Sequence, residues 1–158
     1  MKEAFKTIHG NEFATPQWLF DALNKEFNFE YDLACSMENA KCKKYLAYPE
    51  FDSLEVDWHK LGVGYLWLNP PYSPLKCWIQ KAQQEFLKGA KIVMLVPAIV
   101  STRYFSQVTP SEIRFILGRV PFIKDGVEMK SNTHDSMIVI YDKPSVTKIS
   151  YIERESLK

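Results

Sequence analysis

The sequence of 158 residues predicts an α/β fold with a mixed, mostly parallel sheet and helices on both of its faces. Two continuous apolar runs, residues 65–68 and 91–96, each stop at a proline-containing turn and enclose a segment with helical periodicity. This order of strand, helix and strand requires a crossover connection and therefore parallel strands. The last third contains apolar runs without helices between them, which predicts an antiparallel hairpin at one edge of the sheet.

The helix between the two apolar runs has clear signals at both ends. Ser73 can cap its start, Pro74 suits the first helical position, and Gly89 marks its end. Apolar side chains recur with helical spacing on one face of this segment, at Leu75, Trp78, Ile79, Ala82 and Phe86. The pattern predicts a helix that packs one face against the sheet.

An earlier amphipathic helix is predicted over residues 15–27, with Thr15 as its N-cap and Pro16 at the first helical position. Alternating apolar residues after this helix predict a short strand that ends near residues 32–35. A short helix is then expected over residues 37–45. The sheet would thus receive its first strand between two helices.

In the second half of the chain, a short helix is predicted over residues 101–108. Apolar strands are predicted over residues 113–117, 120–122 and 137–141. The polar segment 124–135 between them is expected to be a mobile loop.

Length and composition predict one compact domain over residues 1–158. The formal net charge of +1 means that binding to a polyanion would need a local cluster of basic side chains. Neither a signal peptide nor a membrane span is expected, which favours a cytoplasmic protein.

Cys35, Cys42 and Cys77 are expected to be free thiols. A metal site is not expected, because Cys35 and Cys42 lack a second close pair of ligands.

Asn69, Pro70, Pro71 and Tyr72 stand between a predicted buried strand and the best-marked helix. In an open α/β sheet, ligands bind beyond the carboxyl ends of the strands, where this turn would lie. The prolines fix the backbone, so the Asn69 amide oxygen and the Pro70 carbonyl can serve as two acceptors aimed at one point. A primary amine with two hydrogens matches this pair.

The exocyclic amine of adenine is a poor nucleophile because its lone pair is conjugated with the ring. Accepting both amine hydrogens favours a pyramidal nitrogen and exposes that lone pair for attack on a sulfonium methyl group. Tyr72 offers a flat face for a base that has been flipped out of the duplex. These residues are therefore interpreted as a catalytic turn. The alternative interpretation is a stiff connection in which Tyr72 only packs against the helix.

The turn resembles the catalytic motif of amino-methyltransferases, and the wider pattern resembles the small phage-type DNA N-6-adenine methyltransferases, a Dam-like family. The resemblance is closest over residues 11–100 and implies a Rossmann-like, S-adenosylmethionine-dependent methyltransferase fold. The matching segments are Phe13-Ala14-Thr15-Pro16, Leu19-Phe20-Asp21-Ala22-Leu23, Phe29-Glu30-Tyr31-Asp32-Leu33-Ala34, Glu38-Asn39-Ala40-Lys41-Cys42, Leu54, Asp57-Trp58, the catalytic turn and Trp78.

The resemblance also implies a site-specific enzyme that transfers a methyl group from S-adenosylmethionine to the exocyclic amine of a flipped-out adenine in double-stranded DNA. By position, Asp32 would hold the ribose or amino-acid end of the cofactor, and Asp57 and Trp58 would lie against its adenine. A carboxylate suits this task because hydroxyl and ammonium groups are donors. The implied cofactor-binding residues are Phe13, Thr15, Pro16, Asp32, Ala34, Asp57 and Trp58.

Basic residues after the catalytic turn are expected near the phosphates of a bound duplex. They are Arg103, Arg114, Arg119, Lys124 and Lys130, and Lys41, Lys43 and Lys44 form a second basic run. Phe122 is expected to be either a second stacking face for the base or a core strand residue. Without a separate recognition domain, residues 124–135 or the partner in a homodimer would have to read the DNA sequence.

Most methyltransferases of this fold carry a Gly-rich loop after the first strand, whereas residues 32–36 contain no glycine. Gly62 and Gly64 precede a strand, which argues against a dinucleotide or nucleoside-triphosphate site. Two alternatives stay open, the first because the same turn serves other amino groups and the second because the Gly-rich loop is missing. One is a methyltransferase that acts on cytosine, an RNA base or a protein glutamine; the other is a catalytically inactive DNA-binding protein.

Overall fold

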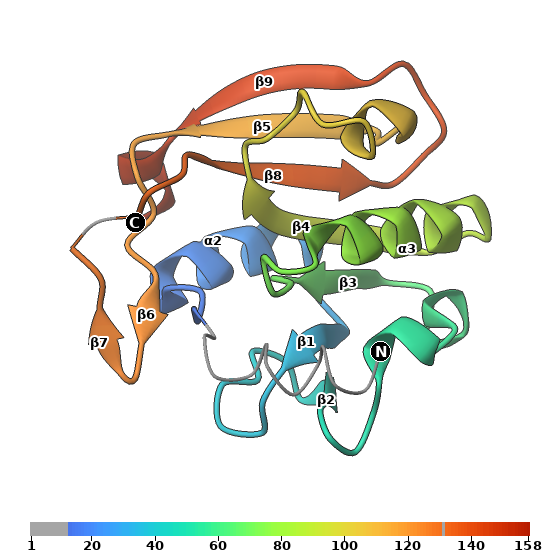
Figure 1. Cartoon of the computed structure of the whole chain (residues 1–158), viewed down its shortest axis with the longest axis horizontal. Coiled ribbons are helices and arrows are strands. Elements are labelled where there is room, and N and C mark those ends of the chain that lie inside the picture. The colour runs from blue at the N-terminus through green and yellow to red at the C-terminus, as the bar shows by residue number, and fades with distance from the viewer. Residues whose placement is uncertain (1–12, 131) are drawn as a thin grey trace.

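The computed structural model describes residues 13–130 and 132–158 (Figure 1). In this part of the chain, seven strands form one sheet in the order β2-β1-β3-β4-β8-β5-β9. Strands β2, β1, β3 and β4 are parallel neighbours, β8 runs antiparallel to β4 and β5, and β9 is parallel to β5. The predicted mixed, mostly parallel sheet is therefore confirmed. The elements are β1 (Tyr31–Cys35), β2 (Lys44–Ala47), β3 (Tyr65–Leu68), β4 (Lys91–Pro97), β5 (Glu112–Leu117), β8 (Ser136–Tyr141), β9 (Lys148–Glu153), α2 (Gln17–Phe27) and α3 (Leu75–Leu87).

Helices α2 and α3 cover opposite faces of the sheet, as the alternating side chains of β4 demonstrate. Ile92, Met94 and Val96 belong to the core cluster that contains the buried side of α3. Val93 and Leu95 belong to the cluster that contains the buried side of α2. The expectation of helices on both faces is confirmed. Among the described residues, no helix has the length and apolar character needed to cross a membrane.

Strand β8 occupies a different place from the one predicted for the C-terminal hairpin. The predicted antiparallel pairing exists, with Ile113 of β5 opposite Val139 of β8. However, β8 lies between β4 and β5, and all of residues 136–141 are buried. A strand that is apolar on both faces needs cover on both faces, which the interior of the sheet provides. Strand β9 therefore forms the edge, and residues 120–122 are irregular instead of forming the predicted strand.

A separate two-stranded sheet lies within the segment that was predicted to be a mobile loop. Its strands are β6 (Ile123–Lys124) and β7 (Val127–Glu128), which pair antiparallel. Asp125 and Gly126 between them have positive φ angles of 51° and 76°, as a type I′ hairpin turn requires. The prediction for residues 124–135 was therefore wrong at its beginning, where the Asp-Gly pair marks the turn.

Of the two shorter predicted helices, one is absent and the other is reduced to a single turn. Residues 37–45 form a turn and the start of β2, because the Asn39 side chain accepts the Ser36 N–H at 2.7 Å and so competes with helical bonding. Within residues 101–108, only Phe105–Gln107 are helical, as a single 3-10 turn. The Thr102 hydroxyl accepts the N–H of Phe105 at 3.4 Å, as an N-cap does, so this turn starts like a helix but does not continue.

Both long helices begin later than the sequence predicted. Pro16 occupies the N-cap of α2, and its carbonyl accepts the N–H groups of Leu19 and Phe20. Pro74 occupies the N-cap of α3, so neither Thr15 nor Ser73 caps a helix through its side chain. The predicted end of α3 is confirmed, because Gly89 follows it with a φ of 105°.

Candidate active site

The turn Asn69-Pro70-Pro71-Tyr72 lies at the carboxyl edge of the parallel strands. It follows β3 directly, and β3 pairs in parallel with β1 on one side and β4 on the other. Pro70 is buried, and the Tyr72 carbonyl accepts the N–H of Leu75, the first residue of α3, at 3.3 Å. The turn is thus fixed between a central strand and a helix, the position that open α/β sheets use for ligands.

The carboxamide of Asn69 has a defined orientation. Its Nδ2 donates a hydrogen bond to the main-chain carbonyl of Phe13 at 3.0 Å, and the side chain is partly exposed. A carbonyl oxygen only accepts hydrogen bonds, so the nitrogen and not the oxygen must face Phe13. The amide oxygen of Asn69 therefore points away from Phe13 as an acceptor for another group.

The segment that contains Phe13 is held against the β6–β7 hairpin. Ala14 donates to the Ile123 carbonyl at 2.8 Å, and Ile123 donates back to the Ala14 carbonyl at 3.0 Å. The ammonium group of Lys124 lies 5.7 Å from the centre of the Phe13 ring. The structure therefore brings three of the predicted site residues, Phe13, Asn69 and Lys124, into one place.

Tyr72 is held by Phe122 from the irregular segment before β6. Their rings meet edge to face, with centroids 6.1 Å apart and planes at 89°. Phe122 is only 3% exposed, so it packs in the core and supports Tyr72 in this structure. The Tyr72 hydroxyl is buried without a hydrogen-bond partner among the described residues, and this burial raises its pKa above the usual value.

Buried hydroxyl groups without partners lie near the same edge. Thr15 Oγ1, directly before the N-cap of α2, and Ser136 Oγ, opposite Pro97 at the end of β4, have no hydrogen-bond partner among the described residues. Buried polar groups are normally paired, and unpaired ones need an explanation. A polar ligand at this edge would supply partners, so these residues fit a cofactor that has both donors and acceptors.

Asp32 organises the turn after β1. The carboxylate is 2% exposed, and it accepts the N–H groups of Ala34 at 3.2 Å and Lys41 at 2.9 Å. The side chains of Asp32 and Asn39 thus fix the backbone of the turn after β1, where most methyltransferases of this fold have a Gly-rich loop.

We expect Asp32→Ala to lower the free energy of unfolding by about 1–3 kcal/mol, because two part-buried N–H groups lose their acceptor. Asp32→Asn keeps one acceptor oxygen and should lose about half as much. Urea denaturation measures both effects, and calorimetry with S-adenosylmethionine measures cofactor affinity. An unchanged unfolding midpoint for Asp32→Ala, together with weakened cofactor binding, would contradict the structural role.

The Asp57-Trp58 pair packs along α3. Trp58 is 0% exposed, donates from Nε1 to the Ser53 carbonyl at 2.8 Å, and stacks against Trp78 with ring centroids 6.3 Å apart. Asp57 lies 3.9 Å from the ammonium of Lys88, which follows the end of α3. Asn69 precedes the other end of this 13-residue helix, which is about 20 Å long. A direct contact of Trp58 with the cofactor stays a prediction.

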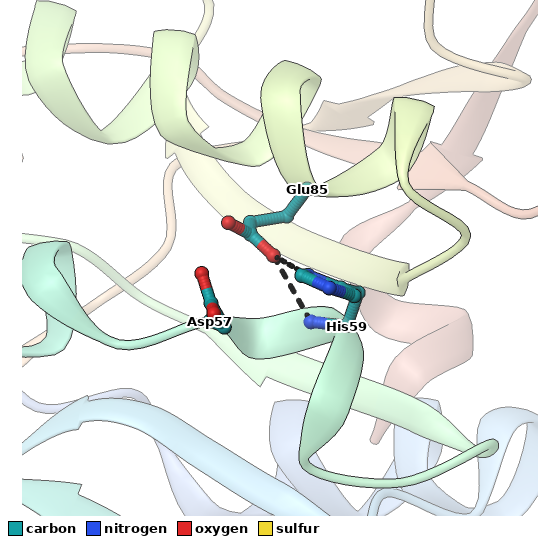
Figure 2. Close-up of side chains that lie close together, drawn as sticks. All are labelled: Asp57, His59 and Glu85. Carbon is teal, nitrogen blue, oxygen red and sulfur yellow. Dashed lines mark hydrogen bonds and ion pairs between the residues drawn. The ribbon is translucent and has the colours of Figure 1, made fainter.

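A cluster of ion pairs around the buried Glu85 lies at the C-terminal end of α3 (Figure 2). Glu85 is 0% exposed and accepts bonds from His59 Nδ1 at 2.7 Å, the His59 N–H at 3.0 Å, Lys81 at 2.7 Å and Lys88 at 3.3 Å. Ligand atoms of Asp57, His59 and Glu85 lie within 4.8 Å of one another, as a metal site would need. Because two ammonium groups already neutralise Glu85, the geometry favours a structural cluster that attaches residues 57–60 to α3.

The Glu85 cluster makes stability depend on pH. Burial alone would raise the pKa of Glu85, but the hydrogen bonds from Lys81 and His59 outweigh it and lower the pKa from 4.5 to about 2. A pKa that is lower in the folded chain stabilises the fold fully above pH 4.5, and this contribution is lost as the pH falls towards 2.

We therefore expect Glu85→Gln to lower the free energy of unfolding by about 3 kcal/mol at pH 7. Below the ordinary glutamate pKa, the difference from wild type should shrink, which urea denaturation between pH 7 and pH 3 would reveal. Glu50→Gln, at an exposed site, is the control and should change little. A constant difference across this range would contradict the assignment.

The basic residues predicted to contact DNA fall into different environments. Arg103 and Lys130 are exposed, and Arg119 bonds to the Asn132 carbonyl at 2.7 Å and to Asp135 at 3.0 Å. Arg114 forms a two-pronged bond with Glu26 at 2.7 Å and also pairs with Glu112. Its charge is thus neutralised by two carboxylates of the chain itself. Lys41, Lys43 and Lys44 line a shallow depression of about 410 Å³ beside α2.

The chain is similar in sequence to known proteins. A family model described as DNA N-6-adenine-methyltransferase (Dam) matches residues 3–158. The chain belongs to this family. The resemblance seen in the sequence is thereby confirmed.

Two curated relatives carry the same description. The DNA N-6-adenine-methyltransferase of Haemophilus phage HP1 (strain HP1c1) is 34% identical over 157 residues, which cover 92% of this chain and 88% of the relative. The DNA N-6-adenine-methyltransferase of Escherichia phage T1 is 30% identical over 105 residues, which cover 66% of this chain and 43% of the relative. The similarity to the Haemophilus phage HP1 protein therefore extends over nearly the whole of both chains.

Proposed function

We propose that this chain transfers a methyl group from S-adenosylmethionine to the exocyclic N6 amine of an adenine in double-stranded DNA. The observation that carries this proposal is the orientation of Asn69. Its amide nitrogen is bound by Phe13, so its oxygen is presented as an acceptor at the carboxyl edge of β3. An acceptor fixed beside rigid prolines suits a primary amine, which must lose the conjugation of its lone pair before it reacts.

Asn69 and Pro70 activate the amine in this proposal. The Asn69 oxygen accepts one amine hydrogen, and the Pro70 carbonyl accepts the other. No main-chain donor occupies the Pro70 carbonyl in residues 13–130 and 132–158. Two fixed acceptors favour the pyramidal nitrogen of the transition state and need no reorganisation during the reaction. The proton that the nitrogen carries after methyl transfer is then released to solvent.

Tyr72 positions the flipped-out base. Its ring is fixed by the edge-on contact with Phe122, and a flat ring beside Asn69 can stack against a purine. In this arrangement Phe122 acts through Tyr72; its own stacking against the base stays a prediction.

Replacing Tyr72 with phenylalanine should preserve activity, because stacking needs the ring and not the hydroxyl. The loss of an unpaired buried hydroxyl should leave the free energy of unfolding unchanged or raise it by up to about 1 kcal/mol. Tyr72→Ala should lower turnover about 10- to 100-fold, since base stacking contributes roughly 1–3 kcal/mol. Steady-state kinetics and thermal denaturation check both variants. A large loss of activity in Tyr72→Phe would assign the hydroxyl a bond to substrate or cofactor.

The cofactor is proposed to lie between the Phe13–Pro16 segment and the turn after β1. When bound, S-adenosylmethionine supplies a sulfonium methyl group as the electrophile. Thr15, whose hydroxyl lacks a partner, would bond to it, and the Phe13 ring would face its positive charge. Asp32 and Ala34 would shape the turn that receives the rest of the cofactor, since both oxygens of Asp32 hold backbone N–H groups.

The DNA is proposed to approach from the side of the β6–β7 hairpin, which stands apart from the seven-stranded sheet (Figure 1). The hairpin is bonded to Ala14 and therefore adjoins Asn69. Lys124 and Lys130 would contact phosphates from this side. Arg119, which pairs with Asp135, and Arg103, which precedes the other end of β5, stay predictions. Arg114 is not included, because Glu26 and Glu112 neutralise it. A homodimer and the single-domain organisation stay predictions.

Incubation with methyl-labelled S-adenosylmethionine and unmethylated duplex DNA, followed by nucleoside analysis, tests this function. We expect the label in N6-methyladenine. Parallel reactions with RNA and with protein acceptors, and analysis for methylated cytosine, test the alternative acceptors. Label in any of these products but not in adenine would contradict the proposal. Calorimetry that detects no cofactor binding would instead favour an inactive DNA-binding protein.

A further inference from the structure

We propose that the main-chain carbonyl of Phe13 is a positioning group that fixes the carboxamide of Asn69 in its active orientation. This carbonyl would also explain why asparagine, and not aspartate, stands at the start of the turn. The inference rests on the proposed catalytic role of Asn69. It adds a group that touches neither substrate nor cofactor and acts only through that side chain.

A carboxamide has two ends of similar size and opposite hydrogen-bonding character. If Asn69 were flipped, its NH₂ group would face the amine of the substrate, and its oxygen would face the Phe13 carbonyl. Both contacts would then pair like with like, donor with donor and acceptor with acceptor. The 3.0 Å bond from Asn69 Nδ2 to the Phe13 carbonyl selects the other orientation.

The Phe13 carbonyl is itself fixed by neighbouring contacts. The two hydrogen bonds between Ala14 and Ile123, at 2.8 and 3.0 Å, attach this segment to the hairpin. Lys124, the next residue of the hairpin, lies over the Phe13 ring. Residues that are far apart in sequence therefore set the orientation of the Asn69 side chain.

Aspartate at this position would behave differently from asparagine. An ionised carboxylate has no donor, so one of its oxygens would face the Phe13 carbonyl without a hydrogen. A protonated carboxyl group could donate to Phe13 and still accept from the substrate with its other oxygen. The Asn69→Asp variant should consequently be active only in its protonated form.

Asn69→Asp tests this inference through two measurements. By carbon NMR, the pKa of the introduced carboxyl should lie above the ordinary aspartate value of about 3.9. At pH 8, turnover should be at least about tenfold below wild type, and it should rise about tenfold for each pH unit lowered until the carboxyl is protonated. Wild type should lack this rise.

Asn24→Asp is the matched control. The Asn24 oxygen accepts the N–H of Phe29 at 2.8 Å, so an introduced carboxylate keeps its donor. Its pKa should therefore stay at or below the ordinary value, and methylation should follow the wild-type pH profile.

The ammonium of Lys124 would lower the pKa of a carboxyl near Phe13. Adding Lys124→Met to Asn69→Asp should therefore raise that pKa further.

A second variant tests the carbonyl from the other side. Ile123→Pro removes the N–H that binds the Ala14 carbonyl, and kcat should fall while Asn69 is intact. With Asn69→Asp also present, kcat at pH 8 should fall no further, because the two changes act on one bond.

An ordinary or lowered pKa for Asn69→Asp, with methylation close to wild type at all pH values, would overturn the inference. Additive losses in the double variant would do the same. Neither result would contradict the catalytic role of Asn69, which is tested separately by Asn69→Ala.

Discussion

Asn69→Ala is expected to lower the rate of methyl transfer by about 10²–10³-fold, because it removes an acceptor that stabilises the transition state. Asn69 is partly exposed, and within the described residues its side chain makes one hydrogen bond, to the main-chain carbonyl of Phe13. The fold should therefore remain intact, with a thermal midpoint close to that of wild type. Single-turnover methylation of duplex DNA measures the chemical step without a contribution from product release.

The control for this variant is Gln84→Ala, which removes an amide from the exposed side of α3. It should leave both turnover and stability unchanged. If Asn69→Ala kept the wild-type rate, Asn69 would not be the activating group, and the proposed mechanism would be wrong. Cofactor affinity should stay the same in both variants, since the amide oxygen of Asn69 is assigned to the substrate amine.

Trp58→Ala is expected to cost about 3–5 kcal/mol of stability, as large-to-small changes of buried aromatic residues do. The ring is fully buried against Trp78 and beneath the ammonium of Lys81, and its Nε1–H is bonded to Ser53. For a small domain this loss is a large share of the total stability. Urea denaturation followed by far-UV circular dichroism measures it.

Trp58→Phe separates a core role from a cofactor role, because it keeps most of the buried apolar volume. We expect a smaller loss of stability and an unchanged affinity for S-adenosylmethionine in calorimetry. Trp18→Ala, at a half-buried site on α2, controls for the loss of a tryptophan. Tenfold weaker cofactor binding in Trp58→Phe, with stability preserved, would support the role that the family resemblance implied for this residue.

The long elements and the catalytic turn were predictable because their signals are local. Apolar runs, prolines and a terminal glycine identified β3, α3 and β4, and their order placed the turn at the carboxyl edge of a parallel sheet. The shorter elements were less predictable. At residues 37–45, hydrogen bonds to the side chains of Asp32 and Asn39 replace helical bonds, and the first of these comes from outside the segment.

Side-chain partners distant in sequence could not be predicted from spacing. Arg114 was expected near DNA, but it is neutralised by Glu26, 88 residues away. Glu85 gave no signal beyond its helical neighbours, yet it bonds to His59, 26 residues away. Whether a charged residue is free to bind a ligand depends on such partners, since a paired charge no longer attracts a phosphate in the same way.

The sequence by itself determined the chemistry that the chain can offer: an asparagine and a tyrosine flanking two prolines, after a strand that must be buried. Only the tertiary structure decided which way that asparagine faces, because its amide nitrogen is bound by a carbonyl 56 residues away. Hydrogen-bonding capacity belongs to the residue type, but the direction in which it is used depends on the neighbours that folding brings close.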